Sequence, residues 1–245
     1  MPNPEAPSLE RVIDQHLYHH HIQPIFCIRS QKFYGFECLL RSEHIKNPQQ
    51  LFQQAILSNK LFDLDTGSVI LALDRLNQYA KQFHPDTKFF LNIYPSTLAS
   101  PAFLILLKET LDASLFSARN VVLEINESEM VHNVDALRRS VRRLQSLGVQ
   151  IALDDIGKGV LPLEMMLKLH PDIIKLDKTY AHRLAYAPRR QQHLKVLSRY
   201  CKEREIDLVL EGIETEQDKE VATACGISYM QGYFLGHPDK ISKYA

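Results

Sequence analysis

Short apolar segments recur along this chain, and most of them end in an acidic, amide or lysine side chain. Between most of these segments, apolar residues recur at the three-to-four-residue spacing of a helix with one buried face. A repeated order of strand and helix closes most readily into a parallel barrel, so the pattern predicts an α/β fold of this kind. The segments and their polar ends span residues 36–41, 89–93, 121–127, 151–156, 173–178, 208–214 and 229–234.

The N-terminal part departs from this regular order. We assign residues 1–14 to an N-terminal tail or linker and residues 15–245 to the barrel domain. The spacing over residues 9–21 is compatible with a helix that caps the barrel, and its last residues, His19–His21, are interpreted as a surface or helix-end feature. Two apolar runs, IQPIFCI and FYGFECLLR, flank the polar residues RSQK, which predicts a hairpin whose strands run antiparallel.

Composition and charge narrow the classes of partner. The chain has 245 residues, of which 45% are apolar and 24% charged, as in an ordinary globular protein. This length is close to the ~250 residues of a single TIM barrel. The 29 basic and 29 acidic residues give zero formal net charge, which disfavours duplex nucleic acid as a partner. A small anionic substrate fits if bound metals supply the positive charge locally.

Targeting signals and cysteines point to a cytoplasmic protein without a membrane span in this chain. No apolar run approaches the ~20 residues needed to cross a bilayer. The start of the chain, MPNPEAPSLERV, lacks the apolar core of a signal peptide. The cysteines have no CxxC spacing and are expected to be free thiols. They are Cys27, Cys38, Cys201 and Cys225.

The pair Asp154–Asp155 is the most informative candidate site. Adjacent acids at a strand end repel each other unless a cation lies between them. Neighbouring side chains on a strand point to opposite faces, so both reach one site only if the strand ends or bends there, and the following GKG allows this. Oxygen ligands suit Mg²⁺ and Mn²⁺, with paired ions ~3.5–4 Å apart. A solvated helix cap is the alternative, which the preceding apolar strand disfavours.

Three further polar residues occupy equivalent strand ends. Glu37 lies within the nearly apolar FECLL, where a buried carboxylate is costly unless a metal or another partner compensates it. Glu124 ends the run VVLE and is either a metal ligand or part of a strand-end salt bridge. Asn92 is either a ligand or the cap of the helix that follows Pro95.

Lys175 and Glu211 are candidates for the reaction itself. Lys175 is flanked by apolar residues in IIKLD, so its ammonium must face the barrel mouth or find a partner. It either stabilises negative charge near an attacking water or pairs with a neighbouring acid such as Glu211. Glu211 is in turn a candidate general base.

The order and spacing of these motifs resemble those of the EAL-domain cyclic-di-GMP phosphodiesterases. Residues 37–39 stand where that family has its Glu-Ala-Leu signature. The resemblance covers residues ~15–240 and implies a modified TIM (β/α)8 barrel with one antiparallel strand near the N-terminus. The matching motifs are QPI, ECLLR, LNI, LEINES, LDDIGKG, IKLDK, LEGIET and QGYFLGHP.

The resemblance also implies a role for each matching residue. Two Mg²⁺ or Mn²⁺ ions would activate water for hydrolysis of cyclic di-GMP to linear pGpG, and Ca²⁺ is expected to inhibit. The implied metal ligands are Glu37, Asn92, Glu124, Asp154 and Asp155. The implied catalytic residues are Lys175, Glu211 and Glu37, supported by Glu127 and Glu214. The implied substrate contacts are Gln23, Leu39, Arg41, Asp177, Gln231, Gly232 and Pro238.

Some positions depart from the family pattern and keep a second function open. The loop after Asp155 reads IGKGVLP and lacks the hydroxyl residues usual there, Asn126 replaces a threonine, and Ser42 replaces an aromatic residue. The alternative function is a weakly active or inactive receptor that binds cyclic di-GMP and signals through protein contacts. The third hypothesis is a protein-interaction module that binds neither metal nor nucleotide. A homodimer and an upstream sensory domain are further expectations from the resemblance.

Overall fold

The computed structural model describes residues 7–125, 129, 133–157 and 168–245. Its strands are β1 His19–Cys27, β2 Lys32–Arg41, β3 Lys88–Ile93, β4 Val121–Ile125, β5 Gln150–Ile156, β6 Ile173–Leu176, β7 Asp207–Leu210, β8 Tyr229–Gln231 and β9 Asp239–Lys240. Its α-helices are α1 Leu9–Asp14, α2 Pro48–Leu57, α3 Leu61–Asn77, α4 Pro95–Leu98, α5 Pro101–Asp112, α6 Val134–Ser146, α8 Pro188–Glu203 and α9 Glu216–Ala224.

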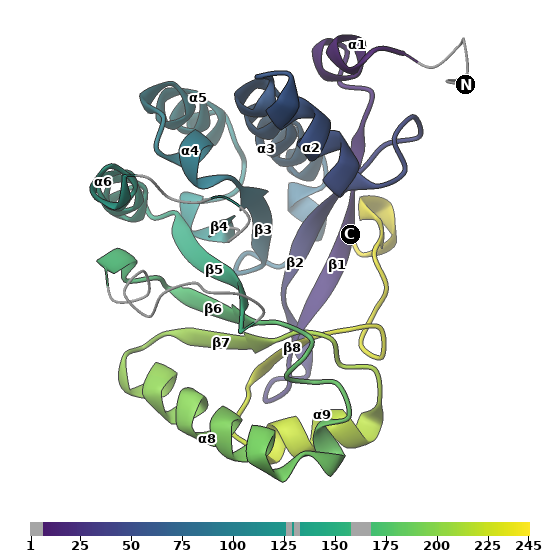
Figure 1. Ribbon diagram of the computed structural model, residues 1–245, viewed down its shortest axis with the longest axis vertical. Coiled ribbons are helices and arrows are strands. Elements are labelled where there is room, and N and C mark those ends of the chain that lie inside the picture. Colours follow the sequence, from purple (N-terminus) through teal and green to yellow (C-terminus); the bar gives the residue numbers. More distant parts are fainter. Residues whose placement is uncertain (1–6, 126–128, 130–132, 158–167) are drawn as a thin grey trace.

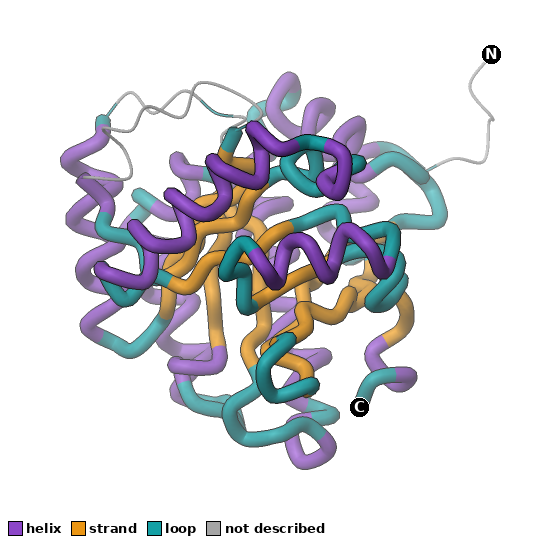
Figure 2. The backbone as a smooth tube through the Cα atoms, turned by 90° about the horizontal axis from the view of Figure 1, so that it is seen from below, coloured by secondary structure: helices purple, strands orange, loops and turns teal. Residues whose placement is uncertain are grey.

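Strands β1 to β8 close into a barrel that the helices surround (Figure 1). The strand order runs from β2 through β8 to β1, and β1 pairs again with β2; the short β9 adds to the free part of β1. Figure 2 shows the strands enclosed by helices when the molecule is turned by 90°. The predicted α/β barrel is therefore confirmed.

Strand β1 is the antiparallel member of the barrel. It pairs antiparallel with β2 on one side and with β8 on the other, whereas β2 to β8 pair parallel in sequence. The hairpin predicted from the two N-terminal apolar runs is confirmed. Because β1 runs in reverse, its beginning, and not its end, lies at the mouth where the parallel strands finish.

The helix predicted over residues 9–21 is wrong in its second half. Helix α1 ends at Asp14, and His19–His21 begin β1, paired with the end of β2. Their ladder with β2 outweighs the local helical spacing. His20 is buried and hydrogen-bonded to Ser68 of α3, so the histidine run is not a simple surface feature.

Helix α1 packs onto the barrel, although the expected boundary after residue 14 counts it with the tail. Its Val12 and Ile13 are buried against Leu40 at the end of β2 and Leu51 of α2. The N-cap Ser8 accepts a hydrogen bond from the backbone N–H of Arg11, which begins the helix. The boundary between tail and barrel after residue 14 stays a prediction.

The barrel interior is arranged in an apolar layer below a polar layer. The apolar layer consists of Ile25, Phe90, Val122, Ala152, Ile173 and Val209, all fully buried. Side chains two residues apart on a strand share a face. The next residue of that face on each parallel strand therefore belongs to the polar layer, and on the reversed β1 it is Gln23, two residues before Ile25.

The helices cover the outside of the barrel with the other buried residues. Helices α3, α5 and α6 pack over strands β3 to β5, and α8 and α9 pack over β6 and β7. Burying each Leu, Val or Phe side chain stabilises the fold by about 1.5–3 kcal/mol. All four cysteines are free thiols. Within the described residues, none of the helices has the length and apolar content to cross a membrane.

Candidate active site

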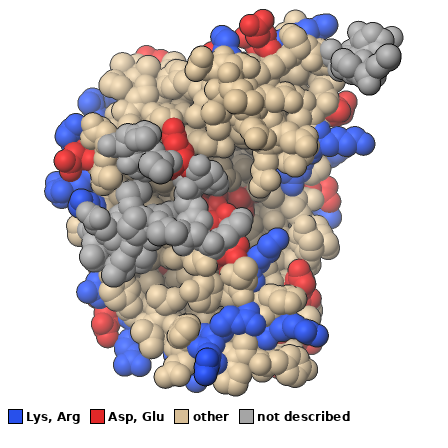
Figure 3. Space-filling model, viewed as in Figure 1, with Lys and Arg blue, Asp and Glu red and all other residues tan. Residues whose placement is uncertain are grey.

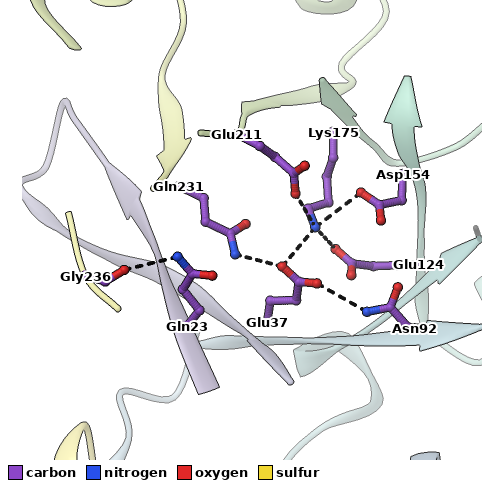
Figure 4. Close-up of polar contacts among 9 residues, drawn as sticks. All are labelled: Gln23, Glu37, Asn92, Glu124, Asp154, Lys175, Glu211, Gln231 and Gly236. Atoms are coloured by element: carbon purple, nitrogen blue, oxygen red, sulfur yellow. Dashed lines mark hydrogen bonds and ion pairs between the residues drawn. The ribbon is translucent and has the colours of Figure 1, made fainter. Parts of the chain in front are cut away.

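Lys175 is the centre of the polar layer, and four carboxylates from different strands surround its ammonium group (Figure 4). Its side chain is fully buried at the mouth end of β6. The Nζ atom lies 2.7 Å from Glu124 Oε1, 2.7 Å from Glu211 Oε1, 3.2 Å from Glu37 Oε2 and 3.3 Å from Asp154 Oδ1. Both expectations for Lys175 therefore hold: its ammonium faces the barrel mouth, and it pairs with acids there.

The charges in this cluster do not balance. One ammonium group faces four carboxylates, all of them largely shielded from water. Burial raises the pKa of Glu124 well above its usual value, raises that of Asp154, and raises that of Glu211 to about 8, against the opposing effect of Lys175. Among the described residues, the polar layer therefore holds more acidic groups than Lys175 can keep ionised.

Glu37 and Lys175 keep their charges in this setting. Burial disfavours both charged forms, but Lys175 and the amides of Gln231 and Asn92 lower the pKa of Glu37. The surrounding carboxylates likewise hold the pKa of Lys175 well above its usual value despite burial. An ionised Glu37 and a protonated Lys175 therefore form the stable core of the cluster.

The end of β5 bends so that two adjacent acids face one site. Asp155 has a positive φ of 56°, and the pairing of β5 with β6 shifts register between Leu153 and Ile156. Carboxylate oxygens of Asp154, Asp155 and Glu211 consequently lie within 4.8 Å of one another. The bend expected from the adjacent acids is observed.

Gly157 completes this bend. Its φ is 103°, and a Cβ at this position would collide with the ring of Tyr180. Only glycine accommodates both the left-handed backbone and the ring. The next residues, 158–162, belong to the altered loop noted in the sequence and lie outside the described residues.

Side-chain amides connect the carboxylates to the neighbouring strands. Asn92 Nδ2 donates to Glu37 Oε1 at 3.2 Å, and Gln231 Nε2 donates to Glu37 Oε2 at 2.7 Å. Helix α4 begins at Pro95 with no side-chain cap, so Asn92 serves the carboxylates and not the helix. Gln23 Nε2 donates to the carbonyl of Gly236 at 3.1 Å.

A cavity of about 330 Å³ opens above the cluster. Figure 3 shows acidic side chains gathered in a hollow near the centre of the face in view. The site residues predicted from the sequence that line this cavity are Gln23, Glu37, Asp154, Asp155, Asp177, Glu211, Glu214, Gln231 and Gly232. Glu124 and Lys175 lie beneath it with no exposed side-chain surface.

A second cavity of about 390 Å³ adjoins the end of β2 and is bordered by α2, α3 and the end of β3. Leu39, Arg41 and Asn92 contribute to its lining. Since Asn92 also donates to Glu37, the two cavities share a wall. This second cavity adds room for a ligand larger than the carboxylate pocket alone would hold.

The other residues predicted for the site are Asp177, Pro238 and Glu127. Asp177 Oδ1 accepts the backbone N–H of Thr179 at 2.8 Å, which fixes the turn after β6. Pro238 lies between β8 and β9, and the structure places it in the lining of neither cavity. Glu127 lies outside the described residues. The structure brings the rest together, and their individual roles stay predictions.

Asp65 is a buried acid that the sequence analysis missed. It is 1% exposed in α3, and its Oδ2 accepts the backbone N–H of Tyr94 at 2.9 Å, just after the strand that carries Asn92. Burial raises its pKa to about 7. The available signal was its place on the apolar face of the helix, four residues before Val69.

The residues present fit divalent cations. Glu124 Oε2 is buried and has no hydrogen-bond or ion-pair partner among the described residues. Leaving a carboxylate oxygen without a partner is costly, whereas a hard cation would satisfy it. The residues that would hold two ions are Glu37, Asn92, Glu124, Asp154, Asp155 and Glu211.

Known proteins resemble this chain over most of its length. The sequence profile described as "EAL domain" matches residues 8–238. The cyclic di-GMP phosphodiesterase PdeF of Escherichia coli strain K12 is 24% identical over 240 residues, which cover 94% of this chain and 31% of that protein. The cyclic di-GMP phosphodiesterase TpdA of Vibrio parahaemolyticus is 27% identical over 217 residues, covering 89% of this chain and 36% of that protein. This chain thus spans about a third of each relative.

Solved structures share the fold. The PaMucR phosphodiesterase in complex with c-di-GMP has a TM-score of 0.85 and 22% identity, covering 97% of this chain and 98% of that chain. Klebsiella pneumoniae BlrP1 in a manganese/cy-diGMP complex has a TM-score of 0.82 and 26% identity, covering 91% of this chain and 56% of that chain. The same BlrP1 has also been solved as a calcium/cy-diGMP complex.

Proposed function

Because this chain belongs to the EAL domain family, as its motifs indicated, we propose that it hydrolyses cyclic di-GMP to linear pGpG with the help of two divalent cations. One observation carries the proposal. Carboxylates from β2, β4, β5 and the residue after β7 converge on Lys175 at the barrel mouth, and bound cations would balance their excess negative charge. Mg²⁺ or Mn²⁺ bound there would supply Lewis-acid stabilisation of the phosphodiester and of the attacking water.

The side chains around the cations have distinct tasks in this proposal. Glu211 lines the cavity beside Asp154 and Asp155, where its carboxylate is placed to accept a proton from water. Lys175 keeps its charge and stabilises the negative charge that develops on the phosphate. Glu37 is held in place by Asn92 and Gln231, so it presents a fixed carboxylate to the reaction.

The substrate would extend across both cavities. Arg41 and Leu39 line the larger one, where an Arg side chain pairs well with a phosphate and a Leu side chain with the face of a base. Gln23, Asp177 and Gly232 line the smaller one beside the carboxylates. A dinucleotide has two bases and two phosphates, which matches two adjoining cavities better than a single nucleotide does.

A cleavage assay tests the proposal. Folded protein with Mg²⁺ or Mn²⁺ is expected to convert cyclic di-GMP to pGpG, and Glu37→Ala is expected to lower kcat by at least about 10²-fold because it removes both a ligand and the partner of Lys175. Glu43→Ala, an exposed residue just after β2, is the matched control and should retain activity. Ca²⁺ is expected to inhibit. Folded, manganese-loaded protein that left cyclic di-GMP intact would contradict the proposal.

Binding of cyclic di-GMP without turnover is the second candidate function. The altered residues after Gly157 favour it, because the hydroxyl groups usual in this loop are missing. Calorimetric titration with cyclic di-GMP separates the two functions, since tight binding without cleavage indicates a receptor. A homodimer and a sensory domain outside this chain are part of the same proposal, and light scattering of the protein tests the dimer.

A further inference from the structure

The larger cavity contains one buried polar atom without a partner. His20 of β1 lines this cavity and is 7% exposed. Its Nε2 lies 2.9 Å from Ser68 Oγ, whereas its Nδ1 has no hydrogen-bond partner among the described residues. A buried ring nitrogen without a partner is costly, so this atom is suited to a bound ligand.

The surroundings of His20 describe the ligand that would fit. The rings of Phe52 and Tyr94 form one wall, with centroids 5.4 Å apart and planes tilted by 32°. Two amides on one face of α2, Gln49 and Gln53, add hydrogen-bonding groups. An aromatic wall with several hydrogen-bonding groups at its edge suits a planar heterocycle such as a purine base.

Ser68 occupies one of the two ring nitrogens of His20. Burial lowers the pKa of His20 to about 3, so its ring is neutral, with one nitrogen as donor and the other as acceptor. Nε2 is paired with Ser68 Oγ, so Nδ1 is left with the role, donor or acceptor, that the tautomer gives it. His20 therefore has one hydrogen bond, through Nδ1, left for a ligand.

We propose that His20, oriented by Ser68, forms a hydrogen bond through Nδ1 to a guanine base of cyclic di-GMP in the cavity between β2, α2 and α3. This inference rests on the proposed function, because it needs cyclic di-GMP as the ligand. Arg41, which follows the register partner of His20 on β2, would hold the adjacent phosphate. His20 would thus select the base while the carboxylate cluster acts on the phosphodiester.

The Kd of cyclic di-GMP, measured by calorimetry with Ca²⁺ present, tests the role of His20. His20→Leu is expected to weaken binding about 3- to 10-fold, as for the loss of one neutral hydrogen bond. In the Mn²⁺ assay the same variant should raise KM by a similar factor and leave kcat within about twofold, because a ground-state contact is lost. Ser68→Ala should produce a smaller change in the same direction. His16→Leu, an exposed histidine outside the cavity, is the matched control and should bind as the wild type does.

The outcomes separate this inference from the proposed function. If the wild type binds cyclic di-GMP and His20→Leu binds equally well, the role of His20 is overturned and the proposed function stands. If the wild type binds without cleaving, hydrolysis is overturned, and the Kd values still decide on His20. No binding by the wild type overturns both.

A spectroscopic measurement covers the case in which His20→Leu does not fold. The ¹⁵N resonance of His20 Nδ1 in the wild type should shift when cyclic di-GMP is added, since a new hydrogen bond forms at that atom. The ring nitrogens of His16 should not respond. A His20 resonance that stays unchanged at saturating ligand overturns the proposal.

Discussion

At the scale of the residue, Lys175 is the most consequential single side chain. Its ammonium is the shared partner of Glu37, Glu124, Asp154 and Glu211 inside the barrel. Lys175→Met is expected to lower the free energy of unfolding by about 3–5 kcal/mol in EDTA, because the buried acids lose their cation. Urea unfolding followed by circular dichroism measures this loss.

Added cations should compensate for the missing lysine in part. The loss caused by Lys175→Met is expected to shrink with saturating Mn²⁺, which supplies positive charge to the same carboxylates. Lys202→Met, at an exposed position of α8, is the control and should change stability little. An equal loss with and without Mn²⁺ would mean that the ion does not compensate for the missing ammonium.

Most of the residue-level site follows from the sequence, and two of its members do not. The strand-end acids, Lys175 and the amides were predictable because a polar residue that ends an apolar strand must find a partner at the barrel mouth. Asp65 was missed, and His20 was wrongly interpreted as a surface or helix-end feature, because each lies on a face turned toward a neighbouring helix or strand. Their partners, Tyr94 and Ser68, are distant in the sequence, and no local pattern identifies such pairs.

At the scale of the element, Asp65 connects α3 to the turn after β3. Its folded-state pKa of about 7 lies above the ordinary value of 3.8, so the folded protein retains a proton that the unfolded chain releases. The stability that Asp65 contributes is therefore fully present below about pH 4 and is lost as the pH rises through about 7. This contribution amounts to at most about 4 kcal/mol.

Asp65→Asn removes this titration and retains an oxygen for the Tyr94 N–H. The variant should match the wild type near pH 4 and exceed it in unfolding free energy above pH 7. Urea midpoints across this range measure the difference, and Asp63→Asn, exposed on the same helix, should show no such trend. A variant less stable than the wild type at pH 8 would mean that the carboxylate is ionised and favourably paired.

At the scale of the whole molecule, acidic side chains from several strands meet at one centre around Lys175. They come from β2, β4, β5 and the residue after β7, with Asn92 from β3, so a cation held by them connects most of the barrel. Binding to the folded state alone stabilises it by about 2.7 kcal/mol at a hundredfold excess over Kd. We expect Mn²⁺ to raise the urea midpoint by a corresponding amount and EDTA to reverse it.

Removing one ligand checks this expectation. Asp154→Asn should abolish most of the stabilisation by Mn²⁺, since the ion loses a carboxylate from the bend of β5. Asp86→Asn, on an exposed loop, should leave it intact. A midpoint in the wild type that is insensitive to Mn²⁺ would rule out a cation site that spans the strands.

The barrel as a whole was accessible from the sequence because its strand and helix periods alternate so regularly. The beginning of β1 was not, because HHHIQP shows no alternation of apolar and polar residues, and the segment becomes a strand by pairing with β2 and β9. Pairing between distant segments decided the structure there, and such contacts leave no local signature.

The reversed direction of β1 has a mechanical consequence. In a barrel of parallel strands only, the chain would enter at the end remote from the reacting groups. Here it enters at the reactive rim, and α1 rests against Leu40, the neighbour of both Leu39 and Arg41. A force or a ligand that displaces α1 would thus move the end of β2 directly. No strain would have to pass through the barrel to reach Leu39 and Arg41.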